Sequence, residues 1–308
     1  MSDDTKDRPP DAPDRRQNPE GANVPGAPIR RTVDSERVWA AIRNELKSDK
    51  DPNAMPTAMY RAMATNKVIE LEHVYLGFGR PILEDVSLAA LAGETIVVAG
   101  ESGTGKSTTL KLILRLLVPD SGRVLIDGED ITTLSFADAL KVREKMGMVF
   151  QGAALFDSLT VFENVAYPLR EHTKMTEEEI EDRVREKLQF VDLNPDRVMD
   201  QLPSDLSGGM RKRVGIARGM ANNPKIMLYD EPTSGLDPLT TGTITHLIIK
   251  LQRELGVTSV VVTHDIRSAF RMASRIAVLH NCKIEFFGTP EEMSGSNDRY
   301  LRDFLGGF

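Results

Sequence analysis

The sequence predicts an α/β protein whose core is a parallel sheet flanked by helices, with an accessory antiparallel β region and a helical subdomain attached to that core. Three observations predict this arrangement. Short β-branched runs alternate with helical stretches, two smaller strand signals stand apart from them, and a helical insert at about 155–222 interrupts the alternation.

The strands of the parallel sheet are expected where β-branched residues cluster. These runs are TIVVA, KIMLY, TSVVVT and RIAVL, at 95–99, 225–229, 258–263 and 275–279. The two smaller signals, at 68–74 and 122–128, predict the antiparallel region. Within the insert, Thr176 followed three residues later by Glu179 forms a capping box before an apolar helical run, which predicts a helix start there.

The first 66 residues differ in composition from the rest. They hold 11 Asp/Glu and 11 Lys/Arg, so this proline-rich extension is neutral and is expected to be largely flexible. Apolar residues recur at helical spacing around Trp39, which favours a short helix at 35–47. The net charge of −7 therefore belongs to residues 67–308, which are expected to form one domain.

Composition excludes several classes of protein. An apolar content of 40% is enough to form a sizeable core. The chain has 46 Asp/Glu and 39 Lys/Arg, so it lacks the overall positive charge on which non-specific nucleic-acid binding depends, and no nucleic-acid partner is expected. No apolar run approaches the roughly 20 residues of a membrane-spanning helix, and the N-terminus lacks a hydrophobic signal region. The sequence thus predicts a soluble, non-secreted protein, and its single cysteine, Cys282, excludes an internal disulfide.

The run GESGTGKST lies between the strand at 95–99 and a helical run at 110–117. It matches Gly-x-x-x-x-Gly-Lys-Ser, whose glycines let backbone N–H groups curl around a polyanion at a helix N-terminus. Lys106 is expected to bridge the β and γ phosphates, and Ser107 to ligate Mg²⁺. A plain glycine turn is the alternative, which the strand–loop–helix order disfavours. The residues expected to bind the nucleotide are Gly100, Glu101, Ser102, Gly103, Thr104, Gly105, Lys106, Ser107 and Thr108.

An acidic pair, Asp230 and Glu231, ends the apolar run at 225–229. Carboxylates at the carboxyl end of a parallel strand project into the crevice where doubly wound sheets bind ligands. Asp230 is expected to hold Mg²⁺, and Glu231 to orient or deprotonate an attacking water. A solvated acidic turn is the alternative, which would be favoured if no phosphate loop preceded the pair.

Further motifs follow the phosphate loop in a fixed order, namely Gln151, the pentapeptide LSGGM at 206–210, the run SGLD at 234–237 and His264. In this order they resemble the ATPase subunit of ABC transporters over essentially all of residues 67–308. The resemblance implies ATP and Mg²⁺ as cofactors and hydrolysis of ATP. It implies as catalytic residues Glu231, His264, Gln151 and Lys106, and as metal ligands Ser107, Gln151 and Asp230. Considered alone, His264 could be a structural histidine, and Gln151 could be a surface glutamine.

The LSGGM pentapeptide precedes a helical stretch whose N-terminus is a second anion-seeking end in the chain. The resemblance implies that Ser207, Gly208 and Gly209 serve the nucleotide of a second copy, so that a homodimer makes two composite sites. It also places an aromatic residue against adenine. Phe78 matches that position better than Tyr75, and the alternative is that Phe78 covers the core edge.

The sequences at 151–173, 207–220 and 299–308 resemble the MlaF-like branch of Mla/Mce-type lipid transporters. Met210 stands where the wider family has glutamine, which weakens a generic importer assignment. The resemblance implies phospholipid transport, an integral membrane permease, a lipid-binding Mce-type component and a peripheral location at the cytoplasmic face of the cell membrane. The alternatives are an ATPase of a polar-solute or lipoprotein transporter, and a soluble ABC-type switch without a membrane partner.

The segment after Gln151 is where such a permease is expected to dock. The sequence predicts an exposed apolar surface there. For any one of its residues, burial inside the helical insert explains the apolar side chain equally well. The residues concerned are Leu155, Phe156, Leu159, Val161 and Phe162.

Overall fold

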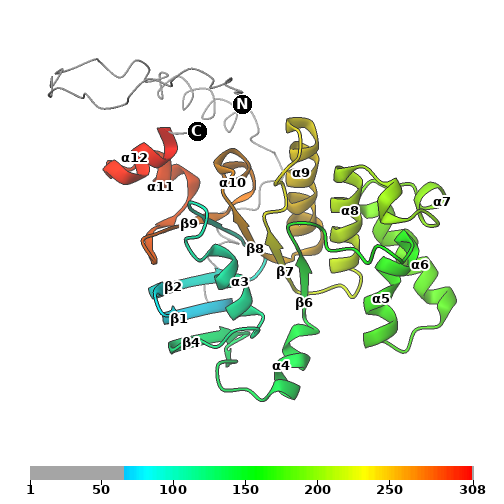
Figure 1. Ribbon diagram of the computed structural model, residues 1–308, viewed down its shortest axis with the longest axis horizontal. Coiled ribbons are helices and arrows are strands. Elements are labelled where there is room, and N and C mark those ends of the chain that lie inside the picture. The colour runs from blue at the N-terminus through cyan, green and yellow to red at the C-terminus, as the bar shows by residue number, and fades with distance from the viewer. Residues whose placement is uncertain (1–65, 307–308) are drawn as a thin grey trace, which may run out of the picture.

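The computed structural model describes residues 66–306 (Figure 1). The helix predicted at 35–47 lies outside the described residues. One sheet is antiparallel, with the strand order β2-β1-β4-β5, and corresponds to the predicted accessory region. Its strands are β1 (Lys67–Gly77), β2 (Pro81–Leu91), β4 (Ser121–Ile126) and β5 (Glu129–Asp130).

The second sheet has six strands in the order β10-β9-β3-β8-β7-β6. The strands from β9 to β6 pair in parallel, and β10 joins the edge antiparallel to β9. The bounds are β3 (Thr95–Ala99), β6 (Met146–Val149), β7 (Ile226–Asp230), β8 (Thr258–Thr263), β9 (Arg275–His280) and β10 (Lys283–Gly288). The expectation of a parallel sheet is therefore confirmed, while the sequence analysis does not predict β2, β5, β6 or β10.

Helices cover the parallel sheet and form a separate lobe beside it. Their bounds are α3 (Lys106–Ile113), α4 (Phe136–Arg143), α5 (Val161–His172), α6 (Glu177–Phe190), α7 (Pro195–Val198), α8 (Gly208–Gly219), α9 (Pro238–Leu255), α10 (Ile266–Met272), α11 (Pro290–Ser294) and α12 (Arg299–Gly306). Within residues 66–306, no helix combines the length and the apolar character needed to cross a bilayer.

The helix expected at 110–117 begins and ends four residues earlier than its apolar run indicates. Helix α3 begins at Lys106 and ends at Ile113, because Arg115 adopts a left-handed backbone with φ of +54°. The guanidinium of Arg115 then donates to the carbonyl of Ile131, 2.9 Å away. Leu116 thus lies outside the helix and is exposed.

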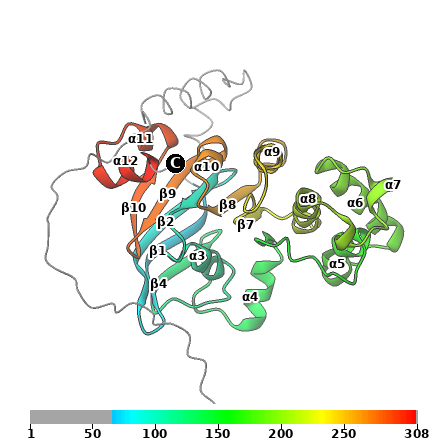
Figure 2. The same ribbon diagram turned by 45° about the horizontal axis from the view of Figure 1, so that its top comes forward.

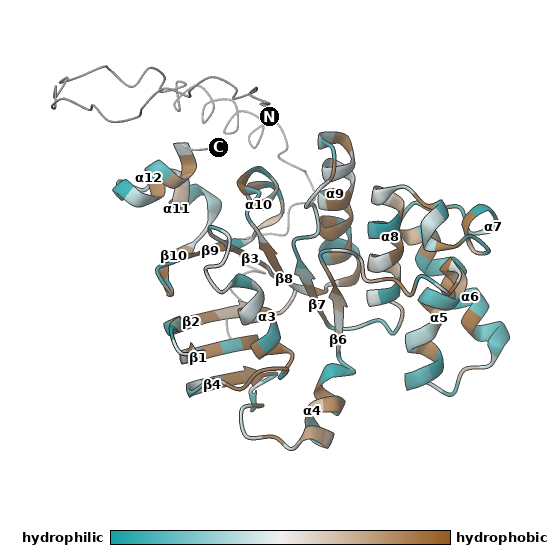
Figure 3. Ribbon diagram, viewed as in Figure 1, coloured by the Kyte–Doolittle hydropathy of each residue, from teal (hydrophilic) through white to brown (hydrophobic). Residues whose placement is uncertain are grey.

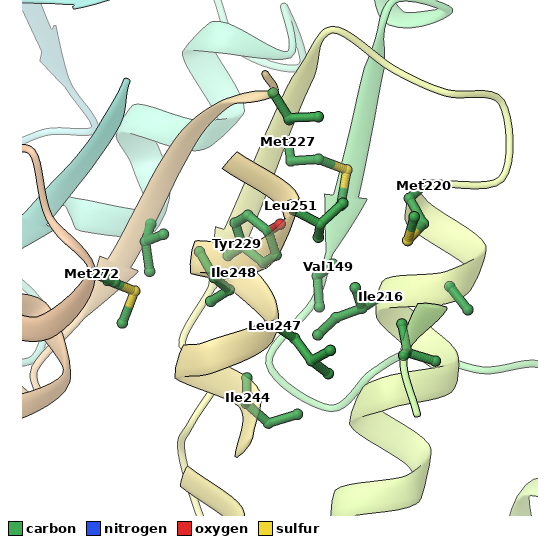
Figure 4. Packing of buried hydrophobic residues seen from close by; sticks show 14 of the residues in the cluster. Val149, Ile216, Met220, Met227, Tyr229, Ile244, Leu247, Ile248, Leu251 and Met272 are labelled. Atoms are coloured by element: carbon green, nitrogen blue, oxygen red, sulfur yellow. The ribbon is translucent and has the colours of Figure 1, made fainter. Parts of the chain in front are cut away.

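The parallel sheet buries both of its faces. Along β3, Val97 and Ala99 belong to one hydrophobic cluster, and Ile96 and Val98 belong to the cluster on the opposite face. Figure 4 shows the first cluster, in which α8 and α9 pack against strands β6 and β7. The second cluster joins the sheet to α3 and the antiparallel sheet. Hydropathy follows this layering, with apolar residues concentrated in the strands (Figure 3).

Helices α5, α6 and α7 lie in a lobe beside α8, away from the strands (Figure 2). The capping box predicted at Thr176 is present: its backbone N–H donates to the carboxylate of Glu179 at 2.7 Å, and its hydroxyl accepts from the Glu179 N–H at 3.3 Å. Thr160 and Glu163 make the same reciprocal pair at the start of α5. Each box satisfies donors that a helix N-terminus leaves without an intrahelical partner.

Asn164 on α5 fixes the loop that leads into this lobe. Its side chain is fully buried, accepts a hydrogen bond from the Phe156 N–H at 2.8 Å and donates to the Phe156 carbonyl at 3.1 Å. The same amide nitrogen lies 3.0 Å from the carbonyls of Leu159 and Thr160. One side chain therefore satisfies backbone groups along the whole turn before α5.

Replacing Asn164 with leucine is expected to lower the free energy of unfolding by about 3 kcal/mol, because the backbone groups of the turn lose the four hydrogen bonds that this buried side chain makes. Thermal and urea unfolding of the full chain would measure the loss. Asn297→Leu, at an exposed position, is the matched control and should change stability by less than about 0.5 kcal/mol. Equal stability of the two variants would contradict this account of the turn.

Candidate functional site

Three parallel strands end at the same edge of the six-stranded sheet. Ala99 at the end of β3 pairs with Thr263 of β8, and Val262 of β8 pairs with Asp230 of β7. The segments that follow these strands therefore meet at one edge, where α3 also begins (Figure 1). This is the location at which open α/β sheets bind ligands.

A pocket of about 350 Å³ opens at this edge. It brings together most of the residues that the sequence predicts for catalysis and phosphate binding. Its lining consists of Ile82, Ser102, Gly103, Gly105, Lys106, Ser107, Thr108, Gln151, Glu231 and His264. Ile82 is the one lining residue that sequence reasoning missed, because β2, which carries it, was not anticipated.

Lys106 is buried at the start of α3 and turns back onto its own loop. Its Nζ donates to the carbonyls of Gly100 at 2.8 Å and Glu101 at 2.7 Å. Burial lowers the pKa of Lys106, and the carboxylates of Glu231, Asp230 and Glu101 oppose that shift. The loop can curl this tightly because Gly100 has no side chain: an added Cβ would lie 2.4 Å from the Leu279 carbonyl.

Ser107, which lines the pocket, is bonded to Asp230, which does not itself line it. The Ser107 hydroxyl donates to Oδ1 of Asp230 at 2.8 Å, which joins the first turn of α3 to the end of β7. Two oxygen ligands thus stand next to the glycine-rich loop. Among residues 66–306 there is no group of three His, Cys, Asp or Glu side chains able to hold a metal alone.

Glu231 and His264 form a close pair at the pocket wall. Nδ1 of His264 lies 2.8 Å from Oε2 of Glu231. Glu231 adopts a left-handed backbone with φ of +48°, and its N–H donates to the Val262 carbonyl at 2.9 Å. A non-glycine residue held in this region costs free energy, and such residues gather at functional sites. The turn directs the carboxylate toward the pocket instead of continuing β7.

Gln151 enters the pocket from the loop after β6. Its amide nitrogen lies 3.4 Å from the Ser234 hydroxyl, a long contact that links the loop to the segment following β7. Asp237, at the end of the 234–237 run, caps α9 by accepting from the N–H groups of Leu239 and Thr240, both at 3.0 Å. The end of the run therefore has a local structural role as the N-cap of α9.

The predicted signature residues and adenine contact lie apart from this pocket. Ser207 caps α8, with its hydroxyl accepting from the Met210 N–H at 3.3 Å, and the pocket lining within residues 66–306 includes none of the 207–209 segment. Phe78, in the turn between β1 and β2, is 62% exposed and does not line the pocket either. Both assignments stay predictions.

A second hollow, of about 520 Å³, lies between α4, β6, α5 and the end of α8. Phe156 lines it, is 44% exposed, and packs against Tyr167 in a tilted arrangement with ring centroids 5.0 Å apart. The apolar surface predicted here is smaller than expected, because Val161 is fully buried and both Leu155 and Phe162 pack against the core.

A glycine-rich loop between a buried strand and a helix, with an acidic pair at the end of a neighbouring parallel strand, defines a P-loop nucleoside triphosphatase. A model of the ABC transporter family matches residues 83–234. The probable ribonucleotide transport ATP-binding protein mkl of Mycobacterium leprae is 42% identical over 246 residues, which cover 80% of this chain and 70% of that protein.

The intermembrane phospholipid transport system ATP-binding protein MlaF of Escherichia coli K12 is 40% identical over 228 residues, 74% of this chain and 84% of that protein. Among solved structures, the dimeric ABC transporter cassette MJ0796 superposes with a TM-score of 0.66 at 39% identity, over 72% of this chain and 98% of that one. The same cassette has also been solved as a dimer bound to ADP and Pi. The chain belongs to the ABC transporter ATPase family and is an ATP-hydrolysing subunit.

Proposed function

We propose that this chain drives phospholipid transport through an integral membrane permease, acting as a homodimer at the cytoplasmic face of the cell membrane. The likeness to MlaF over 84% of that protein's length carries the proposal. A lipid-binding Mce-type component completes the proposed complex. The LSGGM signature, with Met210 in place of the family's glutamine, and the sequences at 151–173 and 299–308 support this branch.

In the proposed reaction, Lys106 releases the carbonyls of its own loop and binds the β and γ phosphates of ATP. Glu231 orients the attacking water in line with the γ phosphate and accepts its proton. His264, already paired with Glu231, and Gln151, which lines the same pocket, contact the γ phosphate and the water. The phosphate loop from Gly100 to Thr108 stabilises the developing charge with its N–H groups.

The oxygen atoms of Ser107 and Asp230, at the pocket and directly beside it, fit Mg²⁺. Ser107 and Asp230 hold hydroxyl and carboxylate oxygens 2.8 Å apart, and Gln151 lines the same pocket. Hard oxygen donors with room for phosphate are what Mg²⁺ prefers, and the ion would neutralise charge on the β and γ phosphates.

The separation of Ser207 from the pocket of its own chain supports a composite site. Helix α8 begins at Gly208, with Ser207 as its N-cap. Its N-terminal N–H groups can bind an anion, but the phosphate loop of the same chain does not adjoin them. A second copy, related by a two-fold axis, would bring Ser207, Gly208 and Gly209 to the first copy's nucleotide. ATP then has higher affinity for the closed dimer, and hydrolysis removes the bridge.

The hollow beside Phe156 is the proposed docking site of the permease. It combines exposed aromatic surface from Phe156 and Tyr167 with the guanidinium of Arg218, which lies 5.8 Å from the Phe156 ring. An amphipathic helix can fill an apolar groove of this kind. Because Gln151 begins the same loop, movement of the docked helix would reach the nucleotide pocket directly.

Glu231→Gln is expected to retain ATP binding and ATP-driven dimerisation but to lower kcat by at least about a thousandfold, because the amide cannot accept the proton of water. Steady-state phosphate release and size-exclusion chromatography with ATP would measure the two properties. Turnover near the wild-type rate would remove Glu231 from the catalytic role.

Phe156→Glu is expected to reduce co-purification of the permease at least about tenfold, because a charge replaces an apolar contact at the groove. Leu255→Glu is the control: Leu255 is 49% exposed against 44% for Phe156, but lies at the end of α9. Equal recovery of permease with both variants would place the docking surface elsewhere.

A second cargo is favoured by one observation, the 42% identity to mkl, whose name specifies ribonucleotide transport. The complex reconstituted in vesicles distinguishes the two. We expect ATP-dependent transfer of fluorescent phospholipid between vesicles, abolished by Glu231→Gln. ATP-dependent uptake of labelled ribonucleotide without lipid transfer would reject the phospholipid proposal.

A further inference from the structure

One face of α8 packs against the loop that carries Gln151 and donates hydrogen bonds to it. The face consists of Lys212, Gly215 and Arg218, spaced three residues apart. Arg218 donates to the carbonyls of Ala153 at 2.9 Å and Ala154 at 2.8 Å. Gly215 permits the close approach, since a Cβ there would meet the Cβ of Ala153 at 3.2 Å.

The loop that carries Gln151 has an uncommon backbone conformation. Ala153 and Ala154 both adopt left-handed conformations, with φ of +63° and +47°. Two successive non-glycine residues in this region are strained and persist only where their surroundings hold them. The hydrogen bonds from Arg218 stabilise these two residues directly, and Lys212 bonds to the carbonyl of Gln151 at the start of the same loop.

Lys212 bonds to two separate motifs at once. It is 6% exposed, and its Nζ donates to the carbonyl of Gln151 and, at 3.3 Å, to the carbonyl of Glu231. Burial lowers the pKa of Lys212, and the carboxylates of Glu231 and Asp230 oppose that shift. A methionine would fill the same space without the cost of burying an ammonium group, so packing alone does not account for a lysine here.

The contact with Glu231 completes the fixation of its turn. The N–H of Glu231 donates to Val262, and its carboxylate pairs with His264. Its carbonyl accepts from two groups, the Ser234 N–H at 3.2 Å and Nζ of Lys212 at 3.3 Å, of which only the Lys212 Nζ also donates to the carbonyl of Gln151. With both backbone groups held, the left-handed turn has little freedom to rotate and the carboxylate keeps its direction into the pocket.

We propose that Lys212 is a positioning residue for ATP hydrolysis, which holds the carbonyls of Gln151 and Glu231 in one fixed relation to α8. Because α8 begins at the predicted signature, Lys212 ties the two pocket motifs to the helix that would serve the partner's nucleotide. The proposal rests on the catalytic role proposed above for Glu231.

The test compares Lys212→Met with Lys187→Met in the full chain, measuring kcat and KM for ATP together with the midpoint of thermal unfolding. Lys187 is the matched control, since it is 2% exposed and donates to Glu186 at 2.8 Å and Asn223 at 2.7 Å, outside the pocket. We expect Lys212→Met to lower kcat about tenfold with KM changed less than about twofold, and Lys187→Met to keep kcat within about twofold at a comparable loss of stability. Lys212→Arg, which retains donors, should recover part of the loss in kcat.

Wild-type kcat in Lys212→Met, or an equal fall in both methionine variants, would overturn the proposal. If Lys212→Met does not fold, Lys212→Gln replaces it: the shorter amide cannot reach both carbonyls, so kcat should fall about threefold with KM unchanged, and a wild-type kcat would reject the role. Turnover in Glu231→Gln is measured in parallel. Activity there would refute the catalytic role proposed for Glu231, on which this inference rests, whereas an inactive Glu231→Gln beside a normal Lys212→Met would refute only the role of Lys212.

Discussion

The parallel pairing of β3 with β8 and of β8 with β7 is the constraint on which the nucleotide site depends. Parallel strands deliver their carboxyl ends to one edge, so the phosphate loop, the acidic pair and His264 converge although they are far apart in sequence. The pairing in turn requires both faces of the sheet to be covered, by α8, α9 and α10 on one side and by α3 with the antiparallel sheet on the other.

In the site, the lysines and the carboxylates have different kinds of hydrogen-bond partner, and this arrangement suits an anionic substrate. The buried ammonium groups of Lys106 and Lys212 donate to backbone carbonyls, whereas the carboxylates of Asp230 and Glu231 are bonded to Ser107 and His264. Carbonyl dipoles orient a lysine without neutralising it. The positive charge of Lys106 therefore remains available to phosphates, which bind a cation more strongly than carbonyls do.

The motif residues and the central strands could be predicted because both depend on local sequence. Strand β8 is apolar or small throughout, as burial on two faces requires, and the phosphate loop needs glycines at fixed spacing. Strand β6 escaped prediction because MGMV is short and contains glycine. Asn164 and Lys212 escaped for a different reason: each is polar within a helical run and resembles a surface residue, and only the fold shows that its partners are carbonyls of other segments.

The strand order also fixes when the phosphate loop can become competent during synthesis. Strand β3 leaves the ribosome early, but its two neighbours, β8 and β9, follow the whole helical lobe in the chain. Until β9 has been made, β3 lacks a partner on one side and the Leu279 carbonyl is absent from beside Gly100. The nascent chain therefore carries a complete glycine-rich sequence long before it carries a formed loop, and non-local closure of this kind makes folding slow and leaves apolar strands exposed to chaperones.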